Sequence, residues 1–147
     1  MARRVVMDAN LALALFLRMV YTAQVYRLMD DLQEQQAEIF APLLWEYECV
    51  SALRRAMMYH AVPAEDAAQF VFDLLALEVV RAAPSFELHQ SALRWAERLG
   101  QSKAYDAQYI ALAEQLQADF WSADEKLVNA LKAQGVGWAH WIGEVGC

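Results

Sequence analysis

Four acidic side chains stand where a folded chain could use them for chemistry. Asp8 directly follows the apolar run VVM, and Asp124 follows the segment FWSA. In an open parallel sheet ligands bind beyond the carboxyl ends of the strands, so polar residues that follow strands are candidate site residues. Glu48 lies inside the apolar helical segment LLWEYECVSALRR, and Asp106 opens the segment YDAQYIALAEQL.

Each of the four also has an ordinary structural explanation. Asp8 and Asp124 can cap the helices that follow them. Asp106 is stabilised near the positive N-terminal end of a helix, and capping is the better single-site explanation for it as well. Glu48 shares a helix face with Arg55 and can form a salt bridge to it. Taken one at a time, these acids are better interpreted as structural.

The pattern of apolar residues predicts the elements that would position the acids. It predicts short strands at residues 3–7, 38–42, 78–82, 119–122 and 138–142. It predicts helices at residues 11–17, 20–36, 43–59, 64–77, 86–99, 105–117 and 125–134. Strands separated by helices indicate an α/β fold, with a mostly parallel central sheet of short strands and helices on both faces.

Length and composition predict one domain, spanning residues 1–147. A chain of 147 residues with 59% hydrophobic and 21% charged residues has ample apolar surface for a core. No internal repeat, linker or glycine-rich phosphate loop interrupts the sequence. Enzymes that use nucleotide cofactors are therefore disfavoured.

The acidic balance argues against a general nucleic-acid coat protein, because such proteins carry a broad basic surface. The formal net charge is -7 and the pI is near 4.9. Local basic pairs at Arg3-Arg4 and Arg54-Arg55 remain able to contact phosphates. For Arg54 and Arg55, a phosphate contact, a solvated face and a salt bridge to a partner protein all stay open.

The two cysteines, Cys49 and Cys147, form neither a disulfide framework nor a zinc pattern. A reducing, cytoplasmic setting is the simplest interpretation. Asp8 interrupts the first apolar stretch, and residues 11–17 are too few to span a bilayer. We therefore expect neither a signal peptide nor a membrane helix.

Four segments, taken in their order along the chain, resemble the PIN-domain nucleases, and most closely the VapC-type toxins of bacterial toxin–antitoxin pairs. They are VVMDANLALALFL, APLLWEYECVSALRR, YDAQYIALAEQL and FWSADEKL. The last two are the most specific. In one, Asp and Ala open an alanine-rich helix; in the other, a strand ends in a small hydroxyl residue that stands two positions before an Asp. The segments span nearly the whole chain.

The resemblance implies a PIN-like three-layer sandwich with a sheet of four to five strands and a metal site. The implied ligands are Asp8, Glu48, Asp106 and Asp124, with Asp8 and Asp106 as the principal ones. Asn10 and Ser122 would support them. Ser51 departs from the family, since many members have asparagine there, and its hydroxyl reaches less far than an amide would.

The resemblance also implies an activity and partners. The activity is hydrolysis of RNA that leaves a 5′-phosphate and a 3′-hydroxyl. The partners would be a small antitoxin and a second copy of the chain, in a homodimer built on helices of the N-terminal half. An exposed apolar face over Leu15 to Leu32 would fit such a dimer.

Elementary electrostatics agrees with a cation at such a cluster. Two like charges about 4 Å apart repel by roughly 1 kcal/mol in water and about 4 kcal/mol at the effective dielectric of a protein surface. Clustered carboxylates therefore destabilise a fold unless a positive ion binds. Oxygen ligands favour Mg²⁺ or Mn²⁺ over zinc, and such an ion activates water for attack on a phosphodiester.

Two other classes of function remain open at this point. A receiver domain or an aspartyl-phosphate hydrolase would also use an Asp after the first strand, but the hydrolases need a second acid two positions on, where this chain has Asn10. A PIN-like RNA- or protein-binding module without turnover is the other alternative.

Histidines and tryptophans do not add a site to this interpretation. His60, His89 and His140 are isolated in the sequence and have no partner at metal-ligand spacing. The tryptophans at positions 45, 95, 121 and 138 fall on apolar patterns, so burial is the better interpretation than base stacking.

Overall fold

The computed structural model describes residues 2–59 and 61–146 of the chain. The interpretations of His60 and Cys147 fall outside these ranges. The strands are β1 (Arg4–Met7), β2 (Glu38–Pro42), β3 (Val79–Ala82), β4 (Asp119–Ser122) and β5 (Ala139–Trp141). The α-helices are α1 (Ala9–Leu13), α2 (Thr22–Glu34), α3 (Leu44–Met58), α4 (Ala67–Leu75), α5 (Phe86–Arg98), α6 (Tyr105–Leu116) and α7 (Glu125–Ala133), with short 3-10 turns η1 (Ala64–Asp66) and η2 (Ile142–Glu144).

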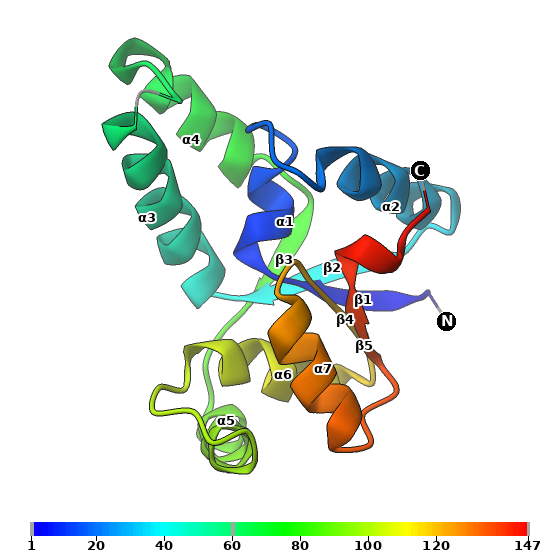
Figure 1. Cartoon of the computed structure of the whole chain (residues 1–147). Coiled ribbons are helices and arrows are strands. Elements are labelled where there is room, and N and C mark those ends of the chain that lie inside the picture. The colour runs from blue at the N-terminus through cyan, green and yellow to red at the C-terminus, as the bar shows by residue number, and fades with distance from the viewer. Residues whose placement is uncertain (1, 60, 147) are drawn as a thin grey trace.

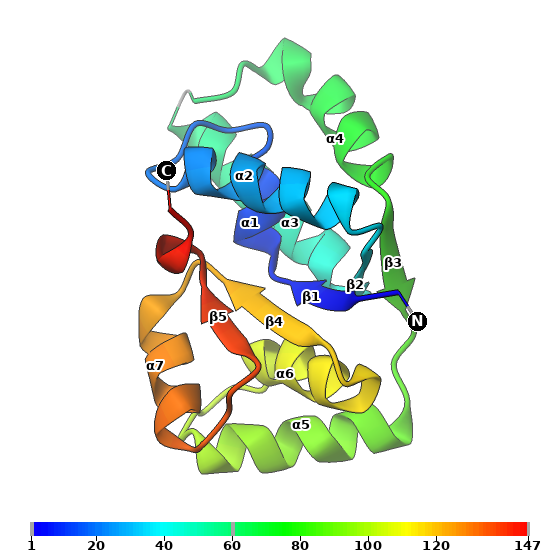
Figure 2. The same ribbon diagram turned by 90° about the vertical axis from the view of Figure 1, so that its right-hand side faces the viewer.

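The strands form one parallel sheet in the order β3-β2-β1-β4-β5. Helices cover both of its faces (Figures 1 and 2), with α1 and α2 on one side and α5, α6 and α7 on the other. Helices α3 and α4 extend from the same side as α1 and α2. The predicted α/β architecture with a parallel sheet between helical layers is confirmed.

The run VVM forms the central strand because its residues can be buried on both faces of the sheet. Val5 and Met7 pack with Val25 and Leu32 of α2, whereas Val6 belongs to the core cluster that includes α6. Successive side chains of a strand point to opposite faces, and strands covered on both faces are continuously apolar rather than alternating. β1 therefore lies between the two cores.

The first helix is shorter than predicted. Its predicted span was residues 11–17, but the helix covers Ala9–Leu13, and the next helix starts at Thr22 rather than at residue 20. The Thr22 hydroxyl accepts a hydrogen bond from the Met19 amide at 2.7 Å. Side-chain bonds of this local kind compete with helical backbone bonds, which explains the late start of α2 but not the early end of α1.

Two further boundaries differ from the prediction. The predicted helix 64–77 divides into η1 and α4, and the predicted strand 138–142 is β5 followed by η2. Trp45 and Trp95 are buried as expected, while Trp121 and Trp138 are only partly buried.

The expected exposed apolar face over Leu15 to Leu32 is not present. Val25, Leu28 and Leu32 are buried in the core, and the large apolar side chains exposed in this stretch are Val20 and Tyr26. These buried residues are one face of an amphipathic helix, and α2 uses that face to cover the sheet. Within the described residues, no helix is long and apolar enough to cross a membrane.

Candidate active site

Asp8, Glu48, Asp106 and Asp124 all line one hollow of about 200 Å³. Asp8 follows the end of β1, and Asp124 comes two residues after the end of β4. β1 and β4 are neighbours in the sheet. β2 lies next to β1 on one side of this pair, and β5 lies next to β4 on the other. The hollow therefore lies at the topological switch point, where open parallel sheets bind ligands.

Asp8 is held by three hydrogen bonds that join α1 to the end of β4. Its Oδ1 accepts from the Leu11 amide at 3.2 Å, which caps α1, and its Oδ2 accepts from Ser122 Oγ at 2.6 Å and from the Ala123 amide at 3.3 Å. Burial raises the pKa of Asp8 to about 6, and the charge of Asp106 adds to the rise, against the three hydrogen bonds. The capping role and the site role thus belong to the same carboxyl group.

Asp124 likewise caps a helix while lining the hollow. Its Oδ1 accepts from the Leu127 amide at 3.0 Å, and its own amide donates to Ser122 Oγ at 3.0 Å. Ser122 is fully buried, so its single hydroxyl links Asp8 with the backbone at Asp124. The two acids that follow strands are therefore held in one hydrogen-bonded unit.

Glu48 and Asp106 approach the hollow from α3 and α6. Glu48 Oε1 accepts from Tyr109 Oη at 2.5 Å. Burial, with the charge of Asp106, raises the pKa of Glu48 despite that hydrogen bond. Loss of water around Asp106, followed by the charge of Asp124, raises the pKa of Asp106. Each raised pKa reports that the negative form is disfavoured in this hollow.

Two of the four acids, Asp106 and Glu48, do not make the cap or the ion pair that their sequence positions predict. Asp106 lies in the first turn of α6, but the capping residue is Ala104, so Asp106 is not a cap. The described residues include no ion pair between Glu48 and Arg55, although both line the hollow. Asp8 and Asp124, in contrast, cap helices and also line the hollow.

The remaining candidates divide between the hollow and the solvent. Asn10, Ser122 and Arg55 line the hollow. Ser51 and Arg54 are exposed and are not among its lining residues, and Ala52 lines it from the α3 position next to Ser51.

Sequence reasoning did not identify Tyr109 and Gln101. Tyr109 lines the hollow, and Gln101 Nε2 donates to Asp106 Oδ2 at 3.4 Å. Tyr109 lies three residues after Asp106, a spacing that places both on one helix face. That spacing is the signal that could have found it.

The chemistry of the hollow suits a hard cation, which the described protein groups would coordinate only in part. No set of three His, Cys, Asp or Glu side chains in residues 2–59 and 61–146 is arranged to hold a metal ion. Mg²⁺ usually keeps several waters and takes only one or two protein carboxylates. The donor types therefore fit a partly hydrated ion rather than one enclosed by the protein.

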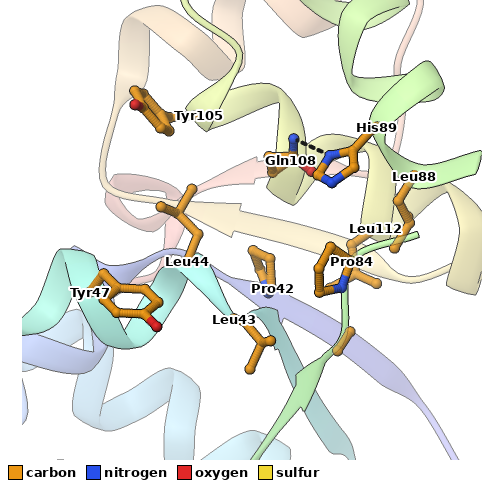
Figure 3. A pocket seen from close by; sticks show the side chains of 11 residues that line it. Pro42, Leu43, Leu44, Tyr47, Pro84, Leu88, His89, Tyr105, Gln108 and Leu112 are labelled. Atoms are coloured by element: carbon orange, nitrogen blue, oxygen red, sulfur yellow. Dashed lines mark hydrogen bonds between the residues drawn. The ribbon is translucent and has the colours of Figure 1, made fainter. Parts of the chain in front are cut away.

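A separate apolar pocket of about 310 Å³ lies beside the hollow (Figure 3). Tyr47 and Tyr105, which directly precede Glu48 and Asp106, line it together with Leu43 and Leu44. Tyr47, Tyr105 and Leu43 are exposed. A depression lined by Tyr105, Asp106 and Glu48 lies between the two. An apolar surface thus adjoins the acidic one.

The fold and the acidic hollow together define the class of protein. Acids from four separate segments meet at the carboxyl edge of a parallel sheet, and the PIN domain family model matches residues 5–132. The chain belongs to the PIN-domain family. The receiver-domain and aspartyl-phosphate hydrolase alternatives are thereby set aside.

Solved structures of three proteins are similar to the chain over most of its length. One is described as a toxin–antitoxin complex from Klebsiella pneumoniae, with a TM-score of 0.62 and 15% identity over 92% of this chain and 95% of that chain. A second is PAE2754 from Pyrobaculum aerophilum, with a TM-score of 0.67 and 21% identity over 98% and 87%. A third is VapC20 from Mycobacterium tuberculosis, described as a Sarcin-Ricin loop cleaving toxin, with a TM-score of 0.63 and 16% identity over 86% and 94%. These likenesses show a shared fold, and no curated protein matches the chain.

Ser122→Ala tests the hydroxyl that joins Asp8 to Asp124. The change leaves Asp8 Oδ2 and the Asp124 amide without this partner, so we expect a loss of about 1–2 kcal/mol in the free energy of unfolding. We also expect divalent-ion affinity to fall about tenfold, as removal of outer-shell partners does in metal sites. Urea unfolding and calorimetric titration with Mn²⁺ measure the two effects. Ser122→Thr, which keeps the hydroxyl, is the control, and equal losses in both variants would contradict the assignment.

Proposed function

We propose that this chain is a divalent-metal-dependent endoribonuclease and the toxin of a type II toxin–antitoxin pair. The observation that carries the proposal is the meeting of Asp8, Glu48, Asp106 and Asp124 around one hollow at the switch point of the sheet. Loss of water around the carboxyl groups raises the pKa of Asp8, Glu48 and Asp106. Negative charge in the hollow therefore has an energetic cost, which a bound cation offsets.

Mg²⁺, or Mn²⁺ in its place, would be held by these four carboxylates directly or through water, with Asp8 and Asp106 as principal ligands. Carboxylate oxygens suit both ions, and His and Cys are absent from the described residues that line the hollow. When bound, the ion supplies an activated water and offsets charge on the phosphodiester. Cleavage would leave a 5′-phosphate and a 3′-hydroxyl.

The side chains around the acids would orient the reacting groups. Ser122 and the Leu11 amide hold the two oxygens of Asp8, and the Leu127 amide holds one oxygen of Asp124. Among the described residues that line the hollow, Arg55 is the cationic one. It is exposed, so it could contact a phosphate of the substrate. Arg54 does not line the hollow, which makes it the weaker candidate of the two.

One observation favours the alternative of a PIN-fold binding module without turnover. In the described part of the chain no three acidic, His or Cys groups are arranged around one ion position. A module that binds RNA or protein would tolerate such an arrangement. An assay that measures both binding and cleavage separates the two functions.

Removal of divalent ions provides that assay. Purified protein with end-labelled RNA is expected to release products with Mg²⁺ or Mn²⁺, to release none in EDTA, and to regain activity when excess Mg²⁺ is restored, because the proposed mechanism uses the ion to activate water and to offset phosphodiester charge. Denaturing gels measure products, and filter binding measures the bound RNA. Bound but intact RNA in every metal would favour the binding module instead.

An antitoxin and a second copy of the chain are the proposed partners. The likeness to a structure described as a toxin–antitoxin complex supports the first. The exposed apolar side chains of Leu43, Tyr47 and Tyr105 beside the pocket in Figure 3 support a protein contact at this surface. Tyr47 lies on α3, in the N-terminal half of the chain, where the homodimer contact is proposed. Sedimentation equilibrium of the purified chain measures the oligomeric state.

A further inference from the structure

Tyr109 is a buried tyrosine whose hydroxyl ends at a site carboxylate. Its side chain is 3% exposed, yet it lines the acidic hollow. Its Oη donates to Glu48 Oε1 at 2.5 Å. Buried tyrosine hydroxyls generally find a hydrogen-bond partner, but here the partner is an acid of the proposed metal site rather than a backbone carbonyl.

The position of this hydroxyl is determined by the core. Tyr109 belongs to the same core cluster as Ile110 and Leu112 of α6, and its ring lies 6.4 Å, centroid to centroid, from that of Phe120 in β4. Asp106 lies three residues earlier on the same helix. Helix α6 therefore presents one site acid itself and, through Tyr109, holds a second one that comes from α3.

A tyrosine hydroxyl and an arginine side chain differ in their effect on the charge of a neighbouring carboxylate. Glu46, two residues before Glu48, pairs with Arg81 at 3.0 Å, so its charge is compensated within the protein. No salt bridge in the described residues involves Glu48. A neutral donor orients a carboxylate and leaves its charge in place, whereas an arginine would cancel it.

The bond also leaves part of the Glu48 carboxylate available. Tyr109 occupies Oε1, and among the described residues no side-chain hydrogen bond to Glu48 Oε2 is present. A carboxylate held at one oxygen keeps acceptor capacity at the other. Glu48 contributes to both the acidic hollow and the depression beside it, where an ion or its water would bind.

We propose that Tyr109 is a positioning residue, which orients the Glu48 carboxylate towards a divalent ion or its water in the acidic hollow. The inference depends on the divalent ion of the proposed function, but it does not depend on RNA cleavage. Outer-shell partners of metal-site ligands typically contribute about 10–100-fold to ion affinity or activity. Tyr109→Phe removes only the hydroxyl, so it isolates this contribution.

The test measures Mn²⁺ affinity of the intact chain by calorimetry, together with the thermal midpoint. Tyr109→Phe is expected to weaken Mn²⁺ binding by about 10-fold or more. The matched control is Tyr26→Phe, which removes a tyrosine hydroxyl that donates to the Leu15 carbonyl at 2.9 Å outside the hollow; its Mn²⁺ affinity is expected to stay within twofold of wild type. A fall in the thermal midpoint with unchanged Mn²⁺ affinity in Tyr109→Phe would overturn the proposal, because a merely structural hydroxyl gives that result.

A double-mutant cycle shows whether Tyr109 acts through Glu48. In a Glu48→Gln background, Tyr109→Phe is expected to change Mn²⁺ affinity by less than twofold, since no carboxylate remains to be oriented. The same loss in both backgrounds would overturn the proposal. Should Tyr109→Phe fail to fold, Glu48→Asp replaces it, because the shorter side chain withdraws the carboxylate from the phenol and keeps the charge; undiminished Mn²⁺ affinity then overturns the proposal.

Failure of this inference is distinguishable from failure of the proposed function. Wild-type protein that binds Mn²⁺ but cleaves no RNA overturns the nuclease and supports an ion site in which Tyr109 can still be tested. Wild-type protein that cleaves RNA, with Tyr109→Phe equal to it in Mn²⁺ affinity and in kcat and KM, overturns the role of Tyr109 alone. Wild-type protein that binds no Mn²⁺ overturns both.

Discussion

Asp8→Asn and Asp106→Asn are each expected to lower Mg²⁺-dependent RNA cleavage by more than about 100-fold while the protein stays folded. Loss of an outer-shell partner alone costs about 10–100-fold in metal sites, and these two residues are the proposed principal ligands. Asparagine has the same shape as aspartate but lacks the charge that holds a cation. Single-turnover cleavage of labelled RNA measures the change.

The fold of both variants is expected to survive for identifiable reasons. Asp8 caps α1 through Oδ1, and asparagine is as good an N-cap as aspartate. Asp106 is exposed and does not cap α6. Asp30→Asn, an exposed position on α2, serves as the control and is expected to keep full activity. Full activity of a folded Asp8→Asn or Asp106→Asn protein would remove these residues from the catalytic site.

The second large effect concerns stability and pH. Burial raises the pKa of Asp8 from its ordinary value of 3.8 to about 6, so the folded protein holds a proton that the unfolded chain releases more readily. The contribution of this group to stability is present below about pH 3.8 and is lost as the pH rises to about 6. A rise of this size corresponds to about 3 kcal/mol in the free energy of unfolding.

Relative to wild type, Asp8→Asn is therefore expected to gain up to about 3 kcal/mol of stability between pH 4 and pH 7 in EDTA. A pH-independent loss is set against this gain, because the asparagine NH2 cannot accept from Ser122 Oγ and the Ala123 amide. The gain should shrink as the pH falls from 6 towards 4, because wild-type Asp8 becomes protonated and neutral like the asparagine. Urea unfolding across this pH range measures both proteins, with Asp30→Asn as the matched change outside the hollow. A difference between the two proteins that is constant with pH would show that Asp8 is not buried as a disfavoured charge.

Added Mg²⁺ should lower the stability of Asp8→Asn relative to wild type at pH 7. A ligand that binds only the folded state stabilises it in proportion to the logarithm of its concentration over its dissociation constant. Wild-type protein, with Asp8 charged, gains this stabilisation, and Asp8→Asn gains less. The destabilisation by the Asp8 charge and the stabilisation by a bound ion can thus both be measured on one carboxyl group.

Local patterns were sufficient for the order of elements. The run VVM, the proline and glycine boundaries and the helical periodicity predict the five strands and most of the helices, because each pattern depends on which face of one element is buried. One error, the late start of α2, lies where a single side-chain bond decides, because the Thr22 hydroxyl accepts from the Met19 amide. The spacing of apolar residues along the sequence carries no information about such a hydrogen bond.

The four acids show a different limit of prediction from sequence. Sequence position alone favoured capping for Asp8 and Asp124, and both do cap helices; the same carboxyl groups also line the hollow. Capping and site roles are not alternatives, because a carboxylate has acceptor capacity for both. The order of four segments along the chain carried more information than any one acid.

By itself, the sequence predicted the parallel α/β architecture and singled out four acids, whose meeting around one hollow it could not show. Only the tertiary structure decided that the acids meet, since β1 and β4 become neighbours by packing of residues far apart, and Ser122 reaches Asp8 across 114 positions. It also placed Ala52 rather than Ser51 at the hollow and brought Tyr109 to Glu48. The rotation of α3 and α6 about their axes is set by long-range packing against the sheet, and that rotation decides which side chain reaches the site.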